Sequence, residues 1–235
     1  MNKELFFEPA DMKFRHEFKY IITLSDYLIL RQRLSAVAEL DPNVPPYGNY
    51  SIRSLYFDNV YDSALKEKLD GINNREKFRI RLYNGDDRFI RLEKKSKLSG
   101  LCSKISAQLT REETERIIAG DIEWMKEQER GLLVELYSKM KFKLLRPRVI
   151  VDYIREPYVY NPGNVRVTLD YNIRTGLTST ALFDTQLPTV AAGSQSYLLE
   201  VKYDEFLPGI IRDIVQLESR RNTAFSKYGI CRIYG

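Results

Sequence analysis

Residues 77–83 read Lys-Phe-Arg-Ile-Arg-Leu-Tyr, and this stretch decides the fold class. Its side chains alternate with a period of two, as in a β-strand, so cationic and apolar residues occupy opposite faces. The polar face carries Lys77, Arg79, Arg81 and Tyr83. The next residues, 84–87, read Asn-Gly-Asp-Asp and are typical of a hairpin turn. We therefore predict an antiparallel pair formed by residues 77–83 and 89–97.

The same alternation recurs along most of the chain. It predicts further strands over residues 14–23, 50–58, 101–109, 149–156, 165–171 and 197–203. Apolar periodicity and capping residues predict helices over 25–38, 62–69, 127–140 and 209–223, and one that begins at the Thr-x-x-Glu box of residues 110–113. Ser25 is the predicted N-cap of the first helix. The segments 41–48 and 178–196 are predicted loops.

About eight strands joined by short turns, together with helices at both ends and in the middle, indicate an α+β fold. The fold class that we predict is an antiparallel β-barrel tunnel with helices packed outside, because closure removes the exposed edges of so many strands. The chain has 235 residues, which fits a single domain over residues 1–235.

The composition excludes several classes of protein. Lys and Arg number 37 against 32 Asp and Glu, so the net charge is +5 and an anionic partner is expected. His16 is the single histidine, which excludes a His-rich metal site and disfavours a Ser-His-Asp mechanism. The only cysteines, Cys102 and Cys231, form no disulfide framework, so a reducing cytoplasm is the expected compartment. We expect neither a membrane span nor a secretory signal, because no apolar run approaches about 20 residues and residues 1–18 contain no apolar signal core.

Charge dominates the polar faces of the predicted strands. A Glu-x-Lys pattern occurs three times, at residues 17–19, 93–95 and 200–202. For any one strand, a solvent-exposed sheet face is an adequate explanation. The opposite faces, however, carry aromatic and β-branched residues that can pack on helices, which leaves the charged faces to line the lumen. A lumen so rich in Lys and Arg is expected to hold a polyanion, and Arg binds phosphate oxygens with two donors at once. Glycine-rich phosphate-binding motifs are absent, so a P-loop mechanism is disfavoured.

Eight ordered segments resemble a known family. They are residues 15–20 (RHEFKY), 54–59 (SLYFDN), 77–83 (KFRIRLY), 92–97 (LEKKSK), 151–156 (VDYIRE), 165–170 (VRVTLD), 199–203 (LEVKY) and 225–228 (FSKY). In this order they resemble the triphosphate tunnel metalloenzymes of the CYTH-like superfamily, and more closely the catalytic domain of the vacuolar transporter chaperone (VTC) family of polyphosphate polymerases. The resemblance implies a tunnel that binds a triphosphate or polyphosphate, with Mg²⁺ or Mn²⁺ as cofactor.

The resemblance also implies roles for individual residues. The residues expected to act in catalysis are Arg79, Arg81, Lys95, Arg166 and Lys227. Those expected to bind the substrate are Lys19, Lys104 and Arg155. Strand alternation adds Lys77, Lys202 and Tyr153 to this group, although Tyr153 could equally pack within the barrel. Glu200 is expected to be the main metal ligand, with Glu17 and Glu93 as weaker candidates, because each of these two could equally hold a neighbouring cation in place.

The function that the resemblance implies is an ATP-dependent polyphosphate polymerase, which transfers the terminal phosphate of ATP to a growing chain. The alternatives are a metal-dependent tripolyphosphatase or nucleoside triphosphatase, and a non-catalytic polyphosphate-binding module. The expected partners are ATP, inorganic polyphosphate and a separate membrane protein on which the chain docks. No nucleic-acid partner is expected, because the basic residues alternate with carboxylates instead of with stacking aromatic residues.

Overall fold

A computed structural model of the chain describes residues 14–193, 196–217 and 220–233, so the prediction that no signal peptide is present falls largely outside the described residues. Eight strands follow one another in a single antiparallel sheet, in the order β1-β10-β8-β7-β3-β4-β5-β6. Their bounds are β1 (His16–Ile22), β3 (Tyr50–Asp58), β4 (Arg75–Tyr83), β5 (Asp86–Leu98), β6 (Leu101–Leu109), β7 (Arg146–Tyr160), β8 (Val165–Thr175) and β10 (Tyr197–Tyr203). The two-residue strands β2 (Glu39–Leu40) and β9 (Val190–Ala191) pair with β7 and β8.

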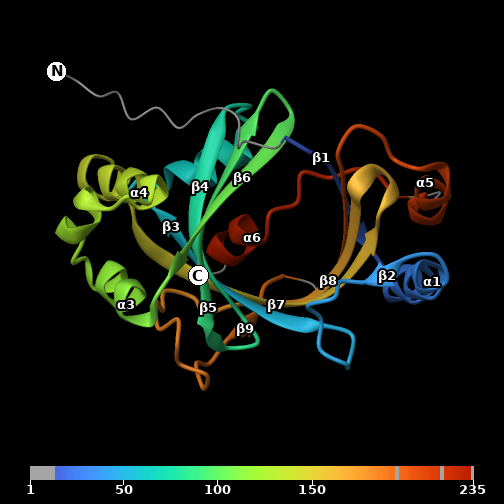
Figure 1. The fold of residues 1–235 in the computed structure, drawn as a ribbon, viewed down its shortest axis with the longest axis horizontal. Coiled ribbons are helices and arrows are strands. Elements are labelled where there is room, and N and C mark those ends of the chain that lie inside the picture. The colour runs from blue at the N-terminus through green and yellow to red at the C-terminus, as the bar shows by residue number, and fades with distance from the viewer. Residues whose placement is uncertain (1–13, 194–195, 218–219, 234–235) are drawn as a thin grey trace.

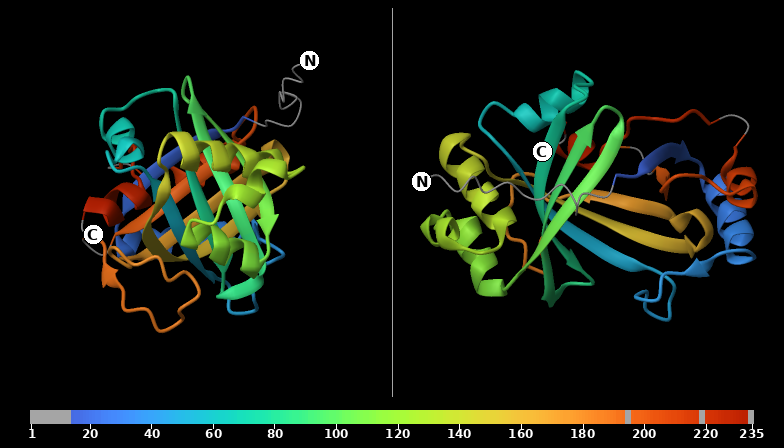
Figure 2. Two further views of the ribbon diagram at one scale, coloured as in Figure 1. Left: turned by 90° about the vertical axis from the view of Figure 1, so that its left-hand side faces the viewer. Right: turned by 45° about the horizontal axis from the view of Figure 1, so that its top comes forward.

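The sheet curls until its first and last strands meet. Arg15, next to β1, and Cys102 of β6 exchange two backbone hydrogen bonds, with N···O distances of 3.1 and 3.3 Å. Figures 1 and 2 show the strands wrapping around a common interior. The predicted α+β class with a barrel-like antiparallel sheet is therefore confirmed, and the curl gives the sheet an inner and an outer face.

The outer face packs against helices at both ends of the molecule (Figure 2). At one end, α3 (Arg111–Ala119), the 3₁₀ helix η2 (Glu123–Glu127) and α4 (Gly131–Phe142) cover the apolar side of β4, β5 and β6. At the other end, α1 (Leu24–Ser35) and α5 (Gly209–Val215) cover β8 and β10. Each fully buried aliphatic side chain in these layers stabilises the fold by roughly 1.5–3 kcal/mol. Two of the three apolar cores in the described part of the chain therefore lie between the sheet and its outer helices. No helix in the described part of the chain has the length and apolar composition needed to cross a membrane.

One helix lies on the inner side of the sheet. Helix α6 (Lys227–Ile233) occupies the centre of Figure 1, with strands around it. Its Tyr228 and Cys231 are fully buried against inner-face residues of β3 and β7, including Tyr56 and Val151. Tyr228 also donates a hydrogen bond from its hydroxyl to the buried Asp58. Helix α2 (Ser63–Leu69) contacts both α6 and β4, so the C-terminal helix is held from two sides.

The start of the first helix differs from the prediction. Ser25 is not its N-cap, because α1 begins at Leu24 and the cap position is taken by Thr23, two residues before the predicted cap. The Thr23 hydroxyl accepts from the backbone N–H of Asp26 at 3.2 Å, and the Asp26 carboxylate accepts from the N–H of Thr23 at 2.9 Å. This reciprocal capping box satisfies two N–H groups that the helix cannot pair internally. The helix ends at Ser35, three residues before the predicted end.

Other boundaries also differ from the predictions. The helix predicted over 209–223 ends at Val215, where Gln216 becomes extended. Farther along, the N–H of Thr223 donates to the carbonyl oxygen of Lys19 at 2.8 Å, so this segment runs beside β1 instead of continuing the helix. The helix predicted over 127–140 begins only at Gly131 as α4, after η2 has ended at Glu127, and the loop predicted over 178–196 contains β9. The capping box of residues 110–113 is confirmed at the start of α3.

Candidate functional site

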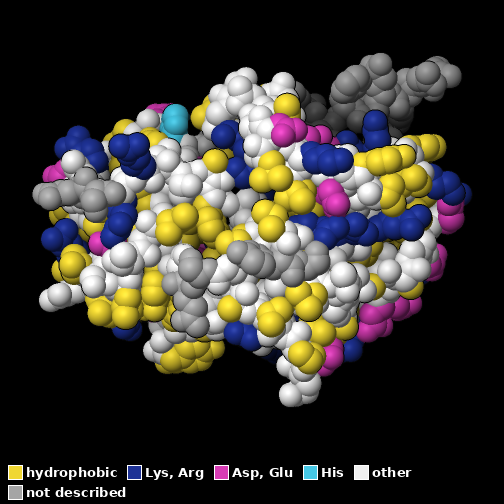
Figure 3. All heavy atoms as spheres, turned by 180° about the vertical axis from the view of Figure 1, so that it is seen from behind, with side chains coloured by type: hydrophobic (Ala, Val, Ile, Leu, Met, Phe, Trp, Pro, Cys, Tyr) yellow, Lys and Arg dark blue, Asp and Glu magenta, His cyan; other side chains and the backbone are white. Residues whose placement is uncertain are grey.

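The alternation of each strand brings the charged residues to the inner face, where they lie opposite one another on neighbouring strands. The register pairs Lys19 with Glu200, Lys202 with Arg166, Arg155 with Asp170, Arg79 with Glu93, Lys77 with Lys95, and Lys95 with Lys104. Seven strands thus supply the predicted site residues. The outer surface seen from behind differs from this interior, because there Lys and Arg side chains lie in separate groups among apolar and acidic ones (Figure 3).

Glu93 of β5 organises one group of cations. Arg79 donates from Nε to the Glu93 carboxylate at 2.7 Å, Arg81 lies 3.6 Å from it, and Lys104 lies 3.3 Å from its other oxygen. Burial opposes the charged form of Glu93, which is only 1% exposed, but the three cations hold its pKa well below the ordinary value. Glu93 was predicted as a weaker metal candidate; in the structure it faces cations with both oxygens.

A second group joins β1 and β10. Lys202 lies 2.7 Å from Glu200 and 3.3 Å from Glu17, while Lys19 lies 3.6 Å from Glu200 and contacts Glu17 as well. The two carboxylates therefore share two lysines in an alternating arrangement. Burial and the proximity of Glu200 act to raise the pKa of Glu17, but Lys19, Lys202 and Lys95 outweigh them and lower it to about 2. The pKa of Glu200 is likewise held well below its usual range, by Lys202 and Lys19 against the effect of burial.

Asp170 connects β8 with β7 and the C-terminal helix. Its fully buried carboxylate accepts two hydrogen bonds from Arg155, at 2.6 and 2.7 Å, and lies 2.6 Å from the Nζ of Lys227. Lys227 also lies 4.7 Å from the centre of the Tyr153 ring, and the Tyr153 hydroxyl accepts from Arg81 at 3.1 Å. Helix α6 therefore brings Lys227, with a side chain only 9% exposed, to the same inner face as the strand residues.

Arg166 lies at the start of β8 and contacts a different carboxylate. Its guanidinium lies 2.9 Å from Asp41, in the loop after β2, and donates to the Tyr50 hydroxyl at 2.8 Å. The sequence offers no local signal for Asp41, because it is 125 positions away from Arg166. The structure thus brings all of the predicted site residues to one face, with Arg166 at its margin.

Two inner-face lysines have no carboxylate within ion-pair distance among the described residues. Across the described ranges, neither Lys77 nor Lys95 forms an ion pair; Lys77 lies 5.8 Å from the centre of the Tyr56 ring. Burial and the nearby cations Lys202 and Arg79 hold the pKa of Lys95 well below its ordinary value, and burial also lowers that of Lys77. A buried cation without a counter-ion destabilises a fold. These two positions therefore favour an anionic ligand.

The carboxylates on this face suit a divalent metal only together with a ligand. The described residues contain no group of three Asp, Glu, His or Cys that could hold a metal. Mg²⁺ bound to a phosphate substrate, however, takes one or two protein carboxylates and fills its other positions with phosphate oxygens and water. Glu200 and Glu17, held side by side by Lys19 and Lys202, fit that requirement.

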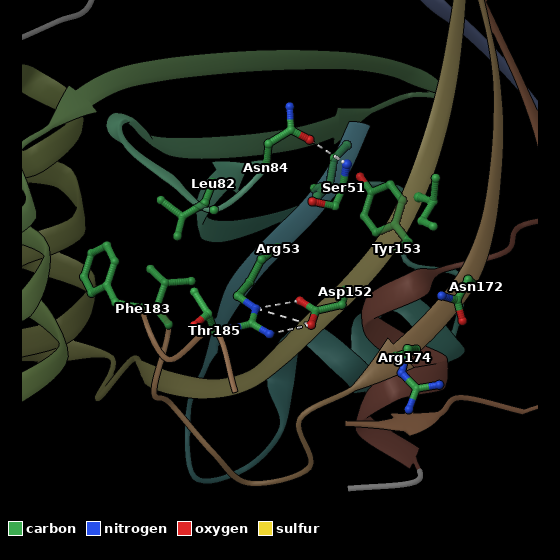
Figure 4. A pocket seen from close by; sticks show the side chains of 14 residues that line it. Ser51, Arg53, Leu82, Asn84, Asp152, Tyr153, Asn172, Arg174, Phe183 and Thr185 are labelled. Carbon is green, nitrogen blue, oxygen red and sulfur yellow. Dashed lines mark hydrogen bonds and ion pairs between the residues drawn. The ribbon is translucent and has the colours of Figure 1, made fainter. Parts of the chain in front are cut away.

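A separate pocket of about 390 Å³ lies on the other side of the sheet (Figure 4). Arg53 and Asp152, which alternate with inner-face Ser54 and Tyr153, line it and form an ion pair at 2.8 Å. Phe183 and Thr185 of the loop before β9 close it. Both cations that line the pocket are already occupied: Arg53 by Asp152 and the carbonyl oxygen of Asp184, and Arg174 by the hydroxyl and carbonyl oxygens of Thr189.

Comparison with known proteins supports the same family as the sequence does. The family model described as the VTC domain matches residues 14–234. Among solved structures, a candidate adenylate cyclase from Bacillus halodurans is similar with a TM-score of 0.51 and 13% identity, over 81% of each chain. A protein from Pyrococcus horikoshii has a TM-score of 0.45 and 12% identity, over 87% of this chain and 92% of that one. A candidate adenylate cyclase from Vibrio parahaemolyticus has a TM-score of 0.44 and 11% identity, over 86% and 82%. No curated protein sequence matches the chain. At 13% identity, the likeness to the Bacillus structure concerns the fold.

Proposed function

The chain belongs to the VTC domain family, and from this premise we propose that it is a divalent-metal-dependent phosphotransferase: an ATP-dependent polyphosphate polymerase that extends a phosphate chain on the inner face of the curled sheet. ATP and inorganic polyphosphate are its proposed substrates, and Mg²⁺ or Mn²⁺ its proposed cofactor. The single domain, the cytoplasmic location and the separate membrane docking partner also stay proposals.

The observation that carries the proposal is the surplus of cations on the inner face. Nine cationic side chains gather around the predicted site on that face, namely Lys19, Lys77, Arg79, Arg81, Lys95, Lys104, Arg155, Lys202 and Lys227. Four carboxylates accompany them, namely Glu17, Glu93, Asp170 and Glu200. The excess of five positive charges matches a ligand with several negative charges on adjacent groups, such as a triphosphate.

Phosphoryl transfer demands positioning and charge neutralisation more than covalent work by the protein. The Glu93 carboxylate holds the planar guanidinium groups of Arg79 and Arg81 in place, so these donors are ordered before the substrate binds. Lys77 and Lys95 supply charges that carboxylates offset only in part, because Glu17 and Glu200 act on them from beyond ion-pair distance. Glu200 and Glu17 would hold the divalent ion, which neutralises charge on the bound phosphates.

Hydrolysis of a triphosphate is the second candidate reaction. Helix α6 fills part of the inner face with Tyr228 and Cys231 and buries Lys227 there, which reduces the room for a long chain. A passage open at both ends, which chain synthesis needs, stays a prediction.

Incubation with ATP and Mn²⁺, followed by separate assays for polyphosphate, free phosphate and ADP, tests the proposal. We expect polyphosphate and ADP from the wild-type chain. Glu200→Gln should reduce turnover at least a hundredfold, because it removes a metal-binding charge at constant volume. Glu135→Gln, on the outer side of the sheet beside Lys94, is the matched control and should keep full activity.

The other outcomes decide between the alternatives. Free phosphate and ADP without polyphosphate would assign the triphosphatase reaction. Binding of tripolyphosphate without turnover would assign the non-catalytic module. Absence of both binding and turnover would refute the proposal.

A further inference from the structure

The cationic inner face continues past Lys77 and Lys95 toward one end of the barrel. Two residues farther along each strand, Arg75 of β4 and Lys97 of β5 lie directly opposite each other. They share the inner face with Lys77 and Lys95, since residues two apart in a strand point to the same side. Lys97 in turn pairs with Cys102 of β6, where the sheet closes on Arg15. The rim of the barrel at the closure point is therefore cationic.

Helix α2 brings a third cation to this rim from outside the sheet. Lys68, in the last turn of α2, is half-buried, and the helix contacts β4. It lies close enough to Arg75, Lys77 and Lys97 to interact with their charges, and also with Lys19 of β1. Burial and these four neighbours lower its pKa to about 8. A helix residue and two strand residues thus face the same small region.

None of the three rim cations forms an ion pair within 4.0 Å among the residues that the structure describes. Arg75 donates to the backbone carbonyl oxygen of Ile72, and neither Lys68 nor Lys97 forms an ion pair. Glu67, on the same helix as Lys68, interacts with Arg75 but also faces Glu76 and Asp58, and burial with these carboxylates raises its pKa. By contrast, Lys94 on the outer side of β5 contacts both Glu76 and Glu135. Cations left crowded and unpaired repel one another unless an anion binds between them.

We propose that Lys68, Arg75 and Lys97 form a phosphate-binding rim, a subsite that takes the phosphates of chains longer than a triphosphate. Two residues of strand advance about 6.6 Å, so Arg75 and Lys97 lie one step beyond Lys77 and Lys95 and extend the cationic face outward. The ligand class is inorganic polyphosphate, and the subsite rests on the proposed function of the inner face. Such a subsite would make the affinity for inorganic polyphosphate depend on the length of the phosphate chain.

Binding of two ligands of different length tests the rim. The dissociation constants of tripolyphosphate and of long-chain polyphosphate are measured by calorimetry for the wild-type chain, Lys68→Met, Lys97→Met and the combined variant. We expect each single variant to weaken long-chain binding about tenfold, as for the loss of a charge-assisted hydrogen bond. Tripolyphosphate binding should stay within about twofold. Lys66→Met, on the exposed side of the same helix, is the matched control and should change neither constant.

The outcomes separate the rim from the site that it extends. A wild-type chain that binds neither ligand refutes the proposed function. Wild-type binding of both ligands with unchanged long-chain affinity in all variants refutes the rim alone. An equal loss for both ligands also refutes it, because the rim would then act on the triphosphate itself. Thermal melts without ligand verify that each variant is folded, and Lys97→Met supplies the test independently if Lys68→Met is unstable.

Discussion

Lys94 and Lys95 are adjacent in the sequence, yet their charges act on stability in opposite directions. Lys94 points outward and lies 3.1 Å from Glu76, and contacts Glu135 as well; these carboxylates raise its pKa against the effect of burial. Lys95 points inward and forms no close ion pair among the described residues; burial, Lys202 and Arg79 outweigh Glu200 and Glu17 and hold its pKa well below the ordinary value. The alternation of one strand therefore places Lys94 in an ion-pair network on the outer side and Lys95 among other cations on the inner side.

Replacing these two lysines in turn should separate ligand binding from folding. Lys95→Met should raise the melting temperature of the unliganded chain, because it removes a destabilised charge. The same change should weaken tripolyphosphate binding about tenfold or more, since hydrogen bonds to charged groups contribute roughly 1.5–3 kcal/mol. Thermal melts with and without tripolyphosphate, together with calorimetric titration, measure both effects.

Lys94→Met is the control for that experiment. It should lower the melting temperature and leave tripolyphosphate affinity unchanged. If Lys95→Met also melts lower and binds the ligand as well as the wild-type chain does, Lys95 is a structural residue and the inner face is not its functional environment.

At the scale of residues, strand parity predicts the inner face well but misses the partners that come from distant segments. A period of two is a local property, so Lys19, Arg79 and Lys95 could be placed together from the sequence. Lys68 could not, because the side of a short helix that meets the end of a barrel is decided by tertiary docking. Asp41 beside Arg166 has the same origin, since a loop residue carries no periodicity.

Among the elements, turns and caps are the features that local sequence determines most directly. Asn84 and Gly85 both have positive φ, at 53° and 69°, as a two-residue hairpin of this twist requires, and the β4–β5 hairpin forms as predicted. Ser25 and Thr23 are both residue types that cap helices; Ser25 is the predicted cap of α1, whereas Thr23 is the N-cap in the structure. The reciprocal bond with Asp26 decides between them, because a capping box needs an acidic or amide residue three positions after the cap.

This assignment can be tested by stability alone. Thr23→Ala should lower the free energy of unfolding by about 1 kcal/mol, because it leaves a helix N–H without its side-chain acceptor. Ser25→Ala, in the first turn of the same helix, should change it by less than about 0.5 kcal/mol. Urea unfolding of both variants gives the two values. A larger loss from Ser25→Ala than from Thr23→Ala would contradict the capping geometry.

Helix α6 shows why some elements escape prediction. It is seven residues long and contains Gly229, so it is too short to be stable alone. It forms where Tyr228 and Cys231 are buried against Tyr56 and Val151, contacts that join segments more than 70 residues apart. The sequence predicts the strands that supply this surface but not the helix that fills it.

For the whole molecule, the important feature is where the excess charge lies. The net charge of +5 is modest for 235 residues and indicates only an anionic partner. The curled sheet concentrates unpaired cations inside while the apolar cores lie between the sheet and the outer helices. Binding and stability are therefore coupled through the protonation of the interior lysines.

This coupling predicts how stability changes with pH. The folded chain lowers the pKa of Lys68 to about 8 and also lowers those of Lys77 and Lys95, whereas their ordinary value is 10.5. Between the folded and unfolded values the unfolded chain binds more protons, so the free energy of unfolding rises with pH. The unliganded chain should accordingly gain stability between about pH 8 and pH 9.5. The raised pKa values of Cys102 and Cys231 oppose this trend from about pH 9, where the unfolded thiols lose their protons. The raised pKa of Lys19 opposes it only above about pH 10.5, where the unfolded lysine loses its proton.

Ligand binding should follow the opposite trend in the same pH range, because each interior lysine that loses its proton withdraws a charge from the phosphates. Melting temperatures at pH 7, 8, 9 and 9.5, with and without saturating tripolyphosphate, measure both effects at once. The increase caused by the ligand should shrink as the pH rises, while the melting temperature of the unliganded chain rises. In Lys95→Met, both the pH dependence of the unliganded melting temperature and that of the ligand-induced increase should be weaker, since one of the titrating lysines is gone. Identical slopes in the wild-type chain and in Lys95→Met would show that Lys95 titrates as a lysine does in water, and that the inner face does not destabilise its charge.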